Sequence, residues 1–510
     1  MRVVATQMAV DGPVDVVVVG AGTSGLGMAA RLRQARVQSL LVLEQAHEIG
    51  GYWRVSDYGA SASDELAVQQ SYSFSPSASA STVWATRDGV LQYHRDLVVR
   101  HDLESALRLR HRVTGLTFDA ADATWRIAVA GKKSVVARKV ILAVGAGKLP
   151  VPPELEGIEQ FDGPVLSTAD WDPNFDFSGR NVAVIAAGAT TVHVVPELVK
   201  RAARVRVFQR TPDWVLPRWG GESPSLAGRL LSRASGTLAG RAVSARYHEV
   251  LGRGLVRQGV GTRLVEAVAE NHLNRNVKDG WLRRNLLPAY RAGTRRILFS
   301  DEFYRALQQD NCKLVPWPVT GVSAVGVRSA DAMTHRADCV VFALDTPEVM
   351  LEPPFPIHGL GGTTLDEFWG TEPTAFHGVN VPGFPNMFLL NGPGSGSHAF
   401  AGLSHTEAQI DYVVAALALV DSLAFVSIEV RPAALKRELA WSSARLDKST
   451  WRDGAFRWYR QRETAANELF PGTATEFRRR LGDIEIADYK ILTEQELGAI
   501  TNSTTIGVAQ

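Results

Sequence analysis

Cysteine is nearly absent from this chain. Its 510 residues include only Cys312 and Cys339, and neither belongs to a CxxC pair or to a cluster of cysteine and histidine. The usual ligand sets of a structural zinc ion are therefore missing, and nothing in the cysteine content requires an oxidising compartment. The sequence predicts no metal site.

Long hydrophobic runs and a net charge of one sign are lacking as well. The opening residues, MRVVATQMAVDGP, hold no apolar stretch of the kind found in a signal peptide, and VVAALALV at 413–420 is too short to span a bilayer. Lysine and arginine (55) nearly balance aspartate and glutamate (53), which favours neither nucleic acid nor an anionic membrane as a partner. We expect a cytoplasmic protein with no membrane span and no nucleic-acid partner.

A glycine-rich turn between two hydrophobic segments stands near the N-terminus. The sequence VDVVVVGAGTSGLGMAARL predicts a buried strand, a turn and a helix, and the apolar run LLVL that follows ends at Glu44. Gly20 permits the tight turn, Gly22 lets the backbone approach a pyrophosphate, and Gly25 lets the helix pack close to the strand. A carboxylate at Glu44 accepts ribose hydroxyls and disfavours a 2′-phosphate. This first site is predicted to hold FAD or NAD rather than NADP.

A second nucleotide-binding pattern occupies residues 181–212. It predicts a strand, a turn, a helix and another strand, at 182–185, 186–188, 190–200 and 205–209. Gly188 in the turn and Thr190 at the start of the helix are the predicted cofactor contacts. The last strand leads into Arg210 and Thr211 rather than into an acid, and a cation with a hydroxyl fits a 2′-phosphate. The second site is predicted to bind NADPH.

The order of these units predicts a nested α/β architecture. A chain of this length forms two or three domains, and we expect two Rossmann-like dinucleotide-binding domains, the second inserted into the first. The FAD-binding domain would comprise 1–150 and 380–510, and the NADPH-binding domain 151–379. Within the latter, apolar spacings in 220–290 indicate a helical insertion.

Several further segments, in this order along the chain, resemble the motifs of flavoprotein monooxygenases and, among these, of the Baeyer–Villiger monooxygenases. They are IGGYWR at 49–54, DELAVQQSYSF at 64–74, ILAVGAGKLPVPP at 141–153, FDGPVLSTADW at 161–171, YRAGTRRILFSDEFYRAL at 290–307 and VPGFPNMFLLNGP at 381–393. The resemblance extends over almost the whole chain.

The resemblance implies an enzyme that uses FAD and NADPH. It would insert one oxygen atom of O2 into a ketone through a flavin peroxide and give an ester or lactone. A small organic molecule and O2 would be its partners. The matching segments imply that Gly51 and Trp53 lie beside the flavin, and that Asn391 and Gly392 bind the cofactor where the chain returns to the FAD-binding domain.

The same resemblance implies the catalytic residues. Arg296 falls on the arginine of the family's active-site loop and would stabilise negative charge on the reacting groups. Asp64 would hold Arg296 in place. The adjacent cation, Arg295, would contact the phosphate or ribose of NADPH.

The chain also departs from the family pattern. The fingerprint histidine is replaced by Ser167, the first glycine of the second turn by Ala186, and a glycine near the end of a later strand by Asp345. Three alternatives therefore stay open. The enzyme would oxygenate nitrogen or sulfur, or it would be an FAD enzyme without NADPH use, namely an oxidase or a redox-neutral isomerase or cyclase. The third alternative is a flavoprotein without catalysis.

Overall fold

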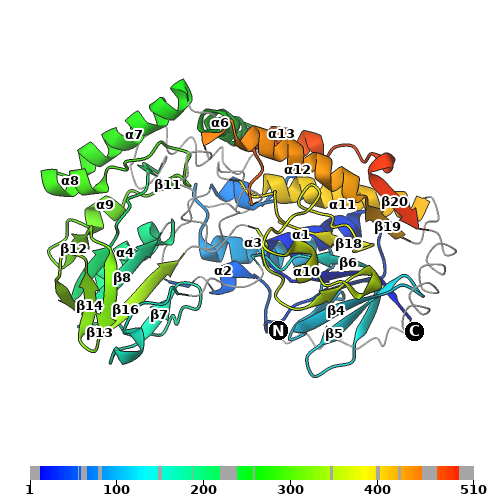
Figure 1. Ribbon diagram of the computed structural model, residues 1–510, viewed down its shortest axis with the longest axis horizontal. Coiled ribbons are helices and arrows are strands. Elements are labelled where there is room, and N and C mark those ends of the chain that lie inside the picture. The colour runs from blue at the N-terminus through cyan, green and yellow to red at the C-terminus, as the bar shows by residue number, and fades with distance from the viewer. Residues whose placement is uncertain are drawn as a thin grey trace.

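The fold contains two α/β units that lie side by side (Figure 1). A computed structural model describes residues 12–55, 57–58, 66–77, 83–146, 152–187, 189–218, 238–256, 259–344, 349–397, 403–422, 427–450 and 468–492. Each unit has a central sheet with parallel strands, and helices cover the sheets. The predicted architecture of two dinucleotide-binding units is confirmed.

The sheet of the first unit has the strand order β17-β4-β5-β6-β1-β2-β3, and β18 also pairs with β6. Its strands are β1 (Val14–Val19), β2 (Leu40–Leu43), β3 (Leu107–Arg108), β4 (Val113–Asp119), β5 (Thr124–Val129), β6 (Val135–Leu142), β17 (Ile357–His358) and β18 (Met387–Leu389). Strands β1, β2, β3, β6 and β18 run parallel, whereas β5 pairs antiparallel with both β4 and β6. The valines of β1 enter two different core clusters, Val16 and Val18 on one face and Val17 and Val19 on the other. Burial on both faces explains the unbroken apolar run.

Helices and a small hairpin complete this unit. Helix α1 packs against α3 and α11, and α11 packs against α13. The elements are α1 (Thr23–Gln34), α2 (Tyr52–Val55), α3 (Arg87–Arg100), α10 (Leu365–Trp369), α11 (Ser404–Ser422), β19 (Ser427–Val430), α12 (Pro432–Leu446), α13 (Ala474–Arg480) and β20 (Tyr489–Leu492).

The second unit is built on a parallel sheet of order β12-β9-β8-β16-β7. Its strands and helices are β7 (Val165–Ser167), β8 (Asn181–Ala187), α4 (Ala189–Arg201), β9 (Arg204–Phe208), α9 (Phe303–Ala306), β12 (Cys312–Val315) and β16 (Cys339–Leu344). An antiparallel meander of β13 (Val319–Ser323), β14 (Gly326–Ser329) and β15 (Thr334–Arg336) follows β12.

Within 220–290, where the sequence predicts a helical insertion, the described residues form α6 (Leu238–Val256), α7 (Val260–Asn276) and α8 (Gly280–Leu286). In Figure 1 these helices lie along the upper side of the molecule. Short strands β10 (Val215–Leu216) and β11 (Leu298–Phe299) pair in parallel before and after the insertion. This pairing brings together the two ends of the chain segment that contains the three helices.

The chain rejoins the first sheet at β17, because Ile357 and His358 pair with β4. That position precedes residue 380, so the exact domain boundaries stay a prediction. Among the residues that the structure describes, no helix is long and apolar enough to cross a membrane.

Candidate active site

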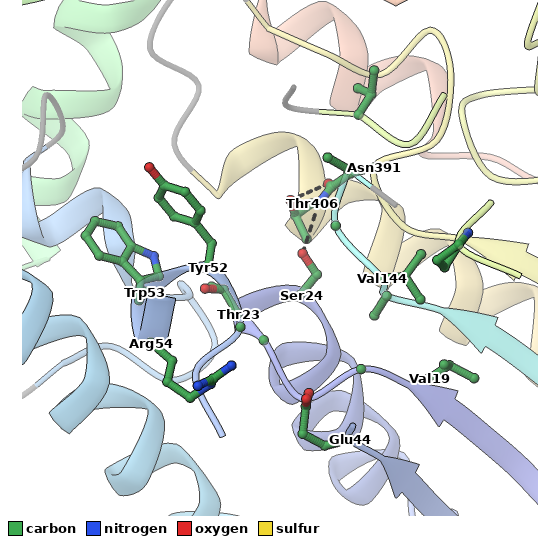
Figure 2. Close-up of a pocket in the computed structure, with 18 of the residues that line it drawn as sticks. Val19, Thr23, Ser24, Glu44, Tyr52, Trp53, Arg54, Val144, Asn391 and Thr406 are labelled. Carbon is green, nitrogen blue, oxygen red and sulfur yellow. Dashed lines mark hydrogen bonds between the residues drawn. The ribbon is translucent and has the colours of Figure 1, made fainter. Parts of the chain in front are cut away.

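A cavity of about 560 Å³ opens where the strands of the first sheet end. Its walls include the turn after β1, the N-terminus of α1, Glu44, the segment 51–55 and the loop 143–146. Ligands of open α/β sheets bind at the carboxyl ends of the strands, so this location suits a dinucleotide. Figure 2 shows the cavity with Glu44 at the end of one strand and with Tyr52 and Trp53 on another wall.

Gly20 and Gly25 make the close backbone contacts that the sequence predicts for the first turn. Gly20 has φ +106°, and a Cβ there would lie 2.4 Å from the carbonyl oxygen of Ala143. A Cβ on Gly25 would lie only 1.9 Å from the carbonyl oxygen of Gly20, so helix α1 rests directly on the strand. Gly22 lines the cavity without a side chain. The N–H groups of Gly20 and Ala21 donate within the protein, to the Leu43 carbonyl and to Glu44, so a phosphate would meet the N-terminus of α1 that follows them.

Glu44 is buried and has a fixed orientation. One of its carboxylate oxygens accepts a hydrogen bond of 2.8 Å from the N–H of Ala21, and the other accepts one of 2.8 Å from the N–H of Ala46. Each carboxylate oxygen has a second lone pair that can accept a hydroxyl. The donor and acceptor set at this end of the cavity fits the ribose of the predicted FAD.

Asn391 is held at the cavity by side chains that sequence reasoning did not single out. Its amide nitrogen donates to Ser24 Oγ at 3.0 Å, and its amide oxygen accepts from Thr406 Oγ1 at 2.8 Å (Figure 2). The side-chain oxygen of Gln409 accepts its backbone N–H at 2.8 Å. No local motif marks Ser24, Thr406 and Gln409 as a group, since they come from two distant helices. Gly392 lies next in the chain but does not line the cavity.

Gly51 and Trp53 both line the cavity, as the resemblance implies. Gly51 has φ +56°, and a Cβ there would lie 2.8 Å from the Cα of Gly22. The rings of Trp53 and Tyr52 meet edge to face, with their centroids 6.2 Å apart. Two glycine-rich segments therefore approach each other next to an aromatic wall.

Arg296 lines the same cavity as the glycine turn, although more than 270 residues separate them. The segment that carries it runs from the end of the helical insertion into β11. Asp64, its predicted partner, lies outside the described residues. The structure thus brings Arg296 to the cofactor cavity, and the role of Asp64 stays a prediction.

Arg295, by contrast, does not line this cavity. Its guanidinium is buried and forms an ion pair with Asp213, with Nη1 3.1 Å from Oδ1. The hydroxyl of Tyr290 donates to the same carboxylate oxygen at 3.1 Å. The interaction of Arg295 with a fixed acid was not visible in the sequence.

The residues predicted for the second site lie at the start of α4 and just after β9. Thr190 is buried at the start of α4, Arg210 is exposed just after β9, and Thr211 is partly buried. Gly188 lies outside the described residues. Thr191, which stands where the family has a glycine, is fully buried. The cofactor roles of these residues stay predictions.

One buried histidine, His94, lies beside the cavity, and another, His405, lies in its wall. His94 Nε2 lies 3.1 Å from Thr23 Oγ1, at the N-terminus of α1, and burial lowers the pKa of His94 to about 4. His405 lines the cavity, its Nδ1 donates to the carbonyl of Ser395 at 2.8 Å, and burial lowers its pKa to about 4. Both side chains are therefore neutral at pH 7. Nothing in the sequence indicates that His94 reaches the phosphate-binding turn.

Comparison with known proteins agrees with this geometry. The family model of the pyridine nucleotide-disulphide oxidoreductases matches residues 17–219. A Baeyer-Villiger monooxygenase of Pseudomonas aeruginosa is 30% identical over 492 residues, which are 96% of this chain and 93% of that protein.

Solved structures show the same fold. An oxidized steroid monooxygenase bound to NADP superposes with a TM-score of 0.80 at 25% identity, over 94% of this chain and 99% of that one. OTEMO in complex with FAD and NADP gives a TM-score of 0.81 at 22% identity, over 94% and 99% of the two chains. The similarity to the Pseudomonas enzyme extends over nearly the full length of both proteins. The chain therefore belongs to the family of Baeyer–Villiger monooxygenases.

Proposed function

We propose that this protein converts a ketone into an ester or lactone with FAD, NADPH and O2. The balanced reaction is ketone + O2 + NADPH + H⁺ → ester + NADP⁺ + H2O. One observation carries the proposal: Arg296 lines the cavity that the phosphate-binding turn of the first unit also lines. A permanent cation at a dinucleotide cavity is suited to a reaction in which negative charge develops on oxygen.

The first unit supplies the groups that would hold FAD. Gly22 and the N-terminus of α1 would face the pyrophosphate, Glu44 would accept the ribose hydroxyls, and Asn391 has a fixed amide in the cavity wall. When bound, FAD supplies electron transfer and activation of O2, and NADPH supplies the hydride. OTEMO, which has the same fold, was solved with both cofactors.

The second unit would hold NADPH. We expect Gly188 and Thr190, the latter in the first turn of α4, to contact its phosphates, and Arg210 and Thr211 to bind the 2′-phosphate. The steroid monooxygenase whose fold matches was solved with NADP. Ala186, which stands where the family has the first glycine of the turn, is the second-last residue of β8 and adds a methyl group there, so we expect binding to be weakened rather than lost.

Arg296 would act on the substrate by electrostatics. Its guanidinium stays protonated at all relevant pH values, so it stabilises the carbonyl oxygen as negative charge builds up there and cannot serve as an acid. Asp64 would keep the guanidinium aimed at the cavity. Oxygenation of a sulfide needs no such stabilisation, because a sulfide has no carbonyl to polarise.

This difference gives the test. In the Arg296→Ala variant, loaded with FAD, we expect ketone oxygenation to fall by about 10²–10³-fold, the effect of removing one oxyanion-stabilising donor. Sulfide oxygenation should persist. The conservative Arg296→Lys variant is the control, because lysine keeps the positive charge but lacks the planar guanidinium group. Normal ketone turnover by Arg296→Ala would refute the assigned role.

Anaerobic mixing of the FAD-loaded protein with NADPH tests the second half of the proposal. Rapid loss of the oxidised-flavin absorbance is the expected result. Absence of bleaching with both NADPH and NADH would instead favour an FAD enzyme that does not use a nicotinamide cofactor, in keeping with Ser167, Ala186 and Asp345.

A further inference from the structure

The loop that carries Arg296 is fixed by a buried ion pair next to it in the chain. The side chains of Arg295 and Asp213 are only 7% and 6% exposed, and Arg295 Nη1 lies 3.1 Å from Asp213 Oδ1. Tyr290 adds a hydroxyl donor to the same oxygen at 3.1 Å, and the Arg295 guanidinium lies 5.3 Å from the centre of the Tyr290 ring. Burial and the neighbouring Asp213 carboxylate raise the pKa of Tyr290. Its hydroxyl therefore stays protonated and acts as the hydrogen-bond donor to Asp213.

The same loop is anchored at further points. The indole N–H of Trp214 donates to the carbonyl of Tyr290 at 2.9 Å, and the N–H of Leu298 donates to the carbonyl of Trp214 at 2.9 Å. On the side of the helical insertion, Glu266 accepts the N–H of Ala292 at 2.9 Å. Arg296 thus stands on a segment that is tied to the stretch before β10 and to α7.

The anchoring stretch leads directly to the predicted nicotinamide site. Asp213 follows Thr211 by two residues and Arg210 by three. Strand β9, which precedes them, belongs to the parallel sheet of the second unit. Asp213 therefore links the part of the second unit that would hold the 2′-phosphate to the loop that places Arg296 in the cavity of the first unit.

We propose that Asp213 and Arg295 are positioning residues that set the location of Arg296 during ketone oxygenation. Arg295 thereby acts through its buried pairing with Asp213 rather than through a contact with NADPH. A buried ion pair with several defined donors stabilises a fold no better than apolar residues of similar size, but it restricts the geometry of the segments it joins. A displacement of about 1 Å at a reacting group can lower a rate about 10²-fold. The inference rests on the proposed role of Arg296.

The ratio of ketone to sulfide oxygenation measures this role. In Asp213→Asn, the buried guanidinium loses its counter-charge and the loop is no longer held in one position. We expect the ketone-to-sulfide ratio to fall by about 10-fold or more toward that of Arg296→Ala. Adding Asp213→Asn to Arg296→Ala should leave the ratio unchanged, because the positioning residues act only through Arg296.

A second variant separates positioning from folding. Replacement of a buried ion pair by apolar residues of similar volume is often neutral for stability, so Asp213→Leu/Arg295→Met should melt near the parent temperature and still show the lowered ratio. The matched control is Lys139→Met, which removes a buried cation paired with Asp15 at 2.9 Å in the first sheet. It should lower the melting temperature without changing the ratio.

The outcomes distinguish the two proposals. If Arg296→Ala lowers the ratio while Asp213→Asn and Asp213→Leu/Arg295→Met keep the parent ratio, the positioning role is refuted and the proposed function stands. If both Asp213 variants lower ketone and sulfide turnover equally, as a general loss of structure would, the positioning role is also refuted. If Arg296→Ala keeps the parent ratio, the proposed function fails first and the inference with it.

Discussion

Replacing Gly25 by alanine would test whether close packing of α1 on β1 is what forms the FAD site. An ideal Cβ at residue 25 would lie 1.9 Å from the carbonyl oxygen of Gly20 and 3.3 Å from the Cβ of Ala143. Contacts of a Cβ essentially never fall below 3.0 Å, so the helix must move by at least about 1 Å. The obstacle is backbone, which cannot rotate away as a flexible side chain would.

Two effects of opposite sign determine the size of the change. Overpacking of this kind costs about 1–3 kcal/mol, and alanine in a helix is favoured over glycine by up to about 1 kcal/mol. FAD binding should be affected more than the free energy of unfolding, because the N–H groups displaced with the helix are those that would face the pyrophosphate. Each hydrogen bond to a charged group contributes about 1.5–3 kcal/mol, so losing one weakens FAD binding by about 10–150-fold.

The assay is reconstitution of the apoprotein with FAD, followed by flavin fluorescence, together with thermal unfolding of the apoprotein. Gly280→Ala provides the matched control, since Gly280 is also helical and its nearest neighbour, Arg284 Nη1, lies 3.9 Å from the added Cβ. The control should be neutral or slightly stabilising and should bind FAD normally. An unchanged dissociation constant for Gly25→Ala would refute the reasoning.

Two further predictions concern pH and cofactor choice. Burial lowers the pKa of His94 and of His405 from 6.5 to about 4. Between these pH values the unfolded chain binds more protons than the folded protein. The free energy of unfolding should therefore rise with pH from about 4 to 6.5 and level off above that range. In urea titrations at several pH values, His94→Leu should flatten this dependence, and an unaltered slope would contradict the burial argument. Arg210→Gln should raise the KM for NADPH by about 10-fold or more without affecting that for NADH, because only NADPH has the 2′-phosphate. Steady-state kinetics with both cofactors will show this, with the exposed Arg204→Gln as the control; an equal effect on both cofactors would count against a phosphate contact.

Much of the fold could be predicted because its signals are local. The apolar run at 14–19 became β1 with the same bounds, and the predicted helix at 190–200 became α4 at Ala189–Arg201. Burial on both faces of a parallel strand leaves an uninterrupted apolar run, and glycine is required wherever φ is positive or backbones touch. Such patterns do not depend on the rest of the chain.

The antiparallel part of the first sheet was not predicted. Strands β4, β5 and β6 pair antiparallel over residues 113–142, and their apolar residues form one core cluster with β17 and β18. The sequence there shows alternation, yet alternation does not specify a partner strand. Pairing was decided by the core, which is assembled from segments more than 200 residues apart.

The sequence by itself determined the two nucleotide-binding turns, their order and the acid or cation that ends each unit, because these features lie within about 30 residues of one another and follow from backbone geometry. Only the tertiary structure decided which polar groups meet. It brings Arg296 to the cavity of the first turn, joins Asn391 to Ser24 and Thr406, and buries Arg295 against Asp213. These contacts depend on how separate elements pack, and a buried charge reveals its partner only when the chain is folded.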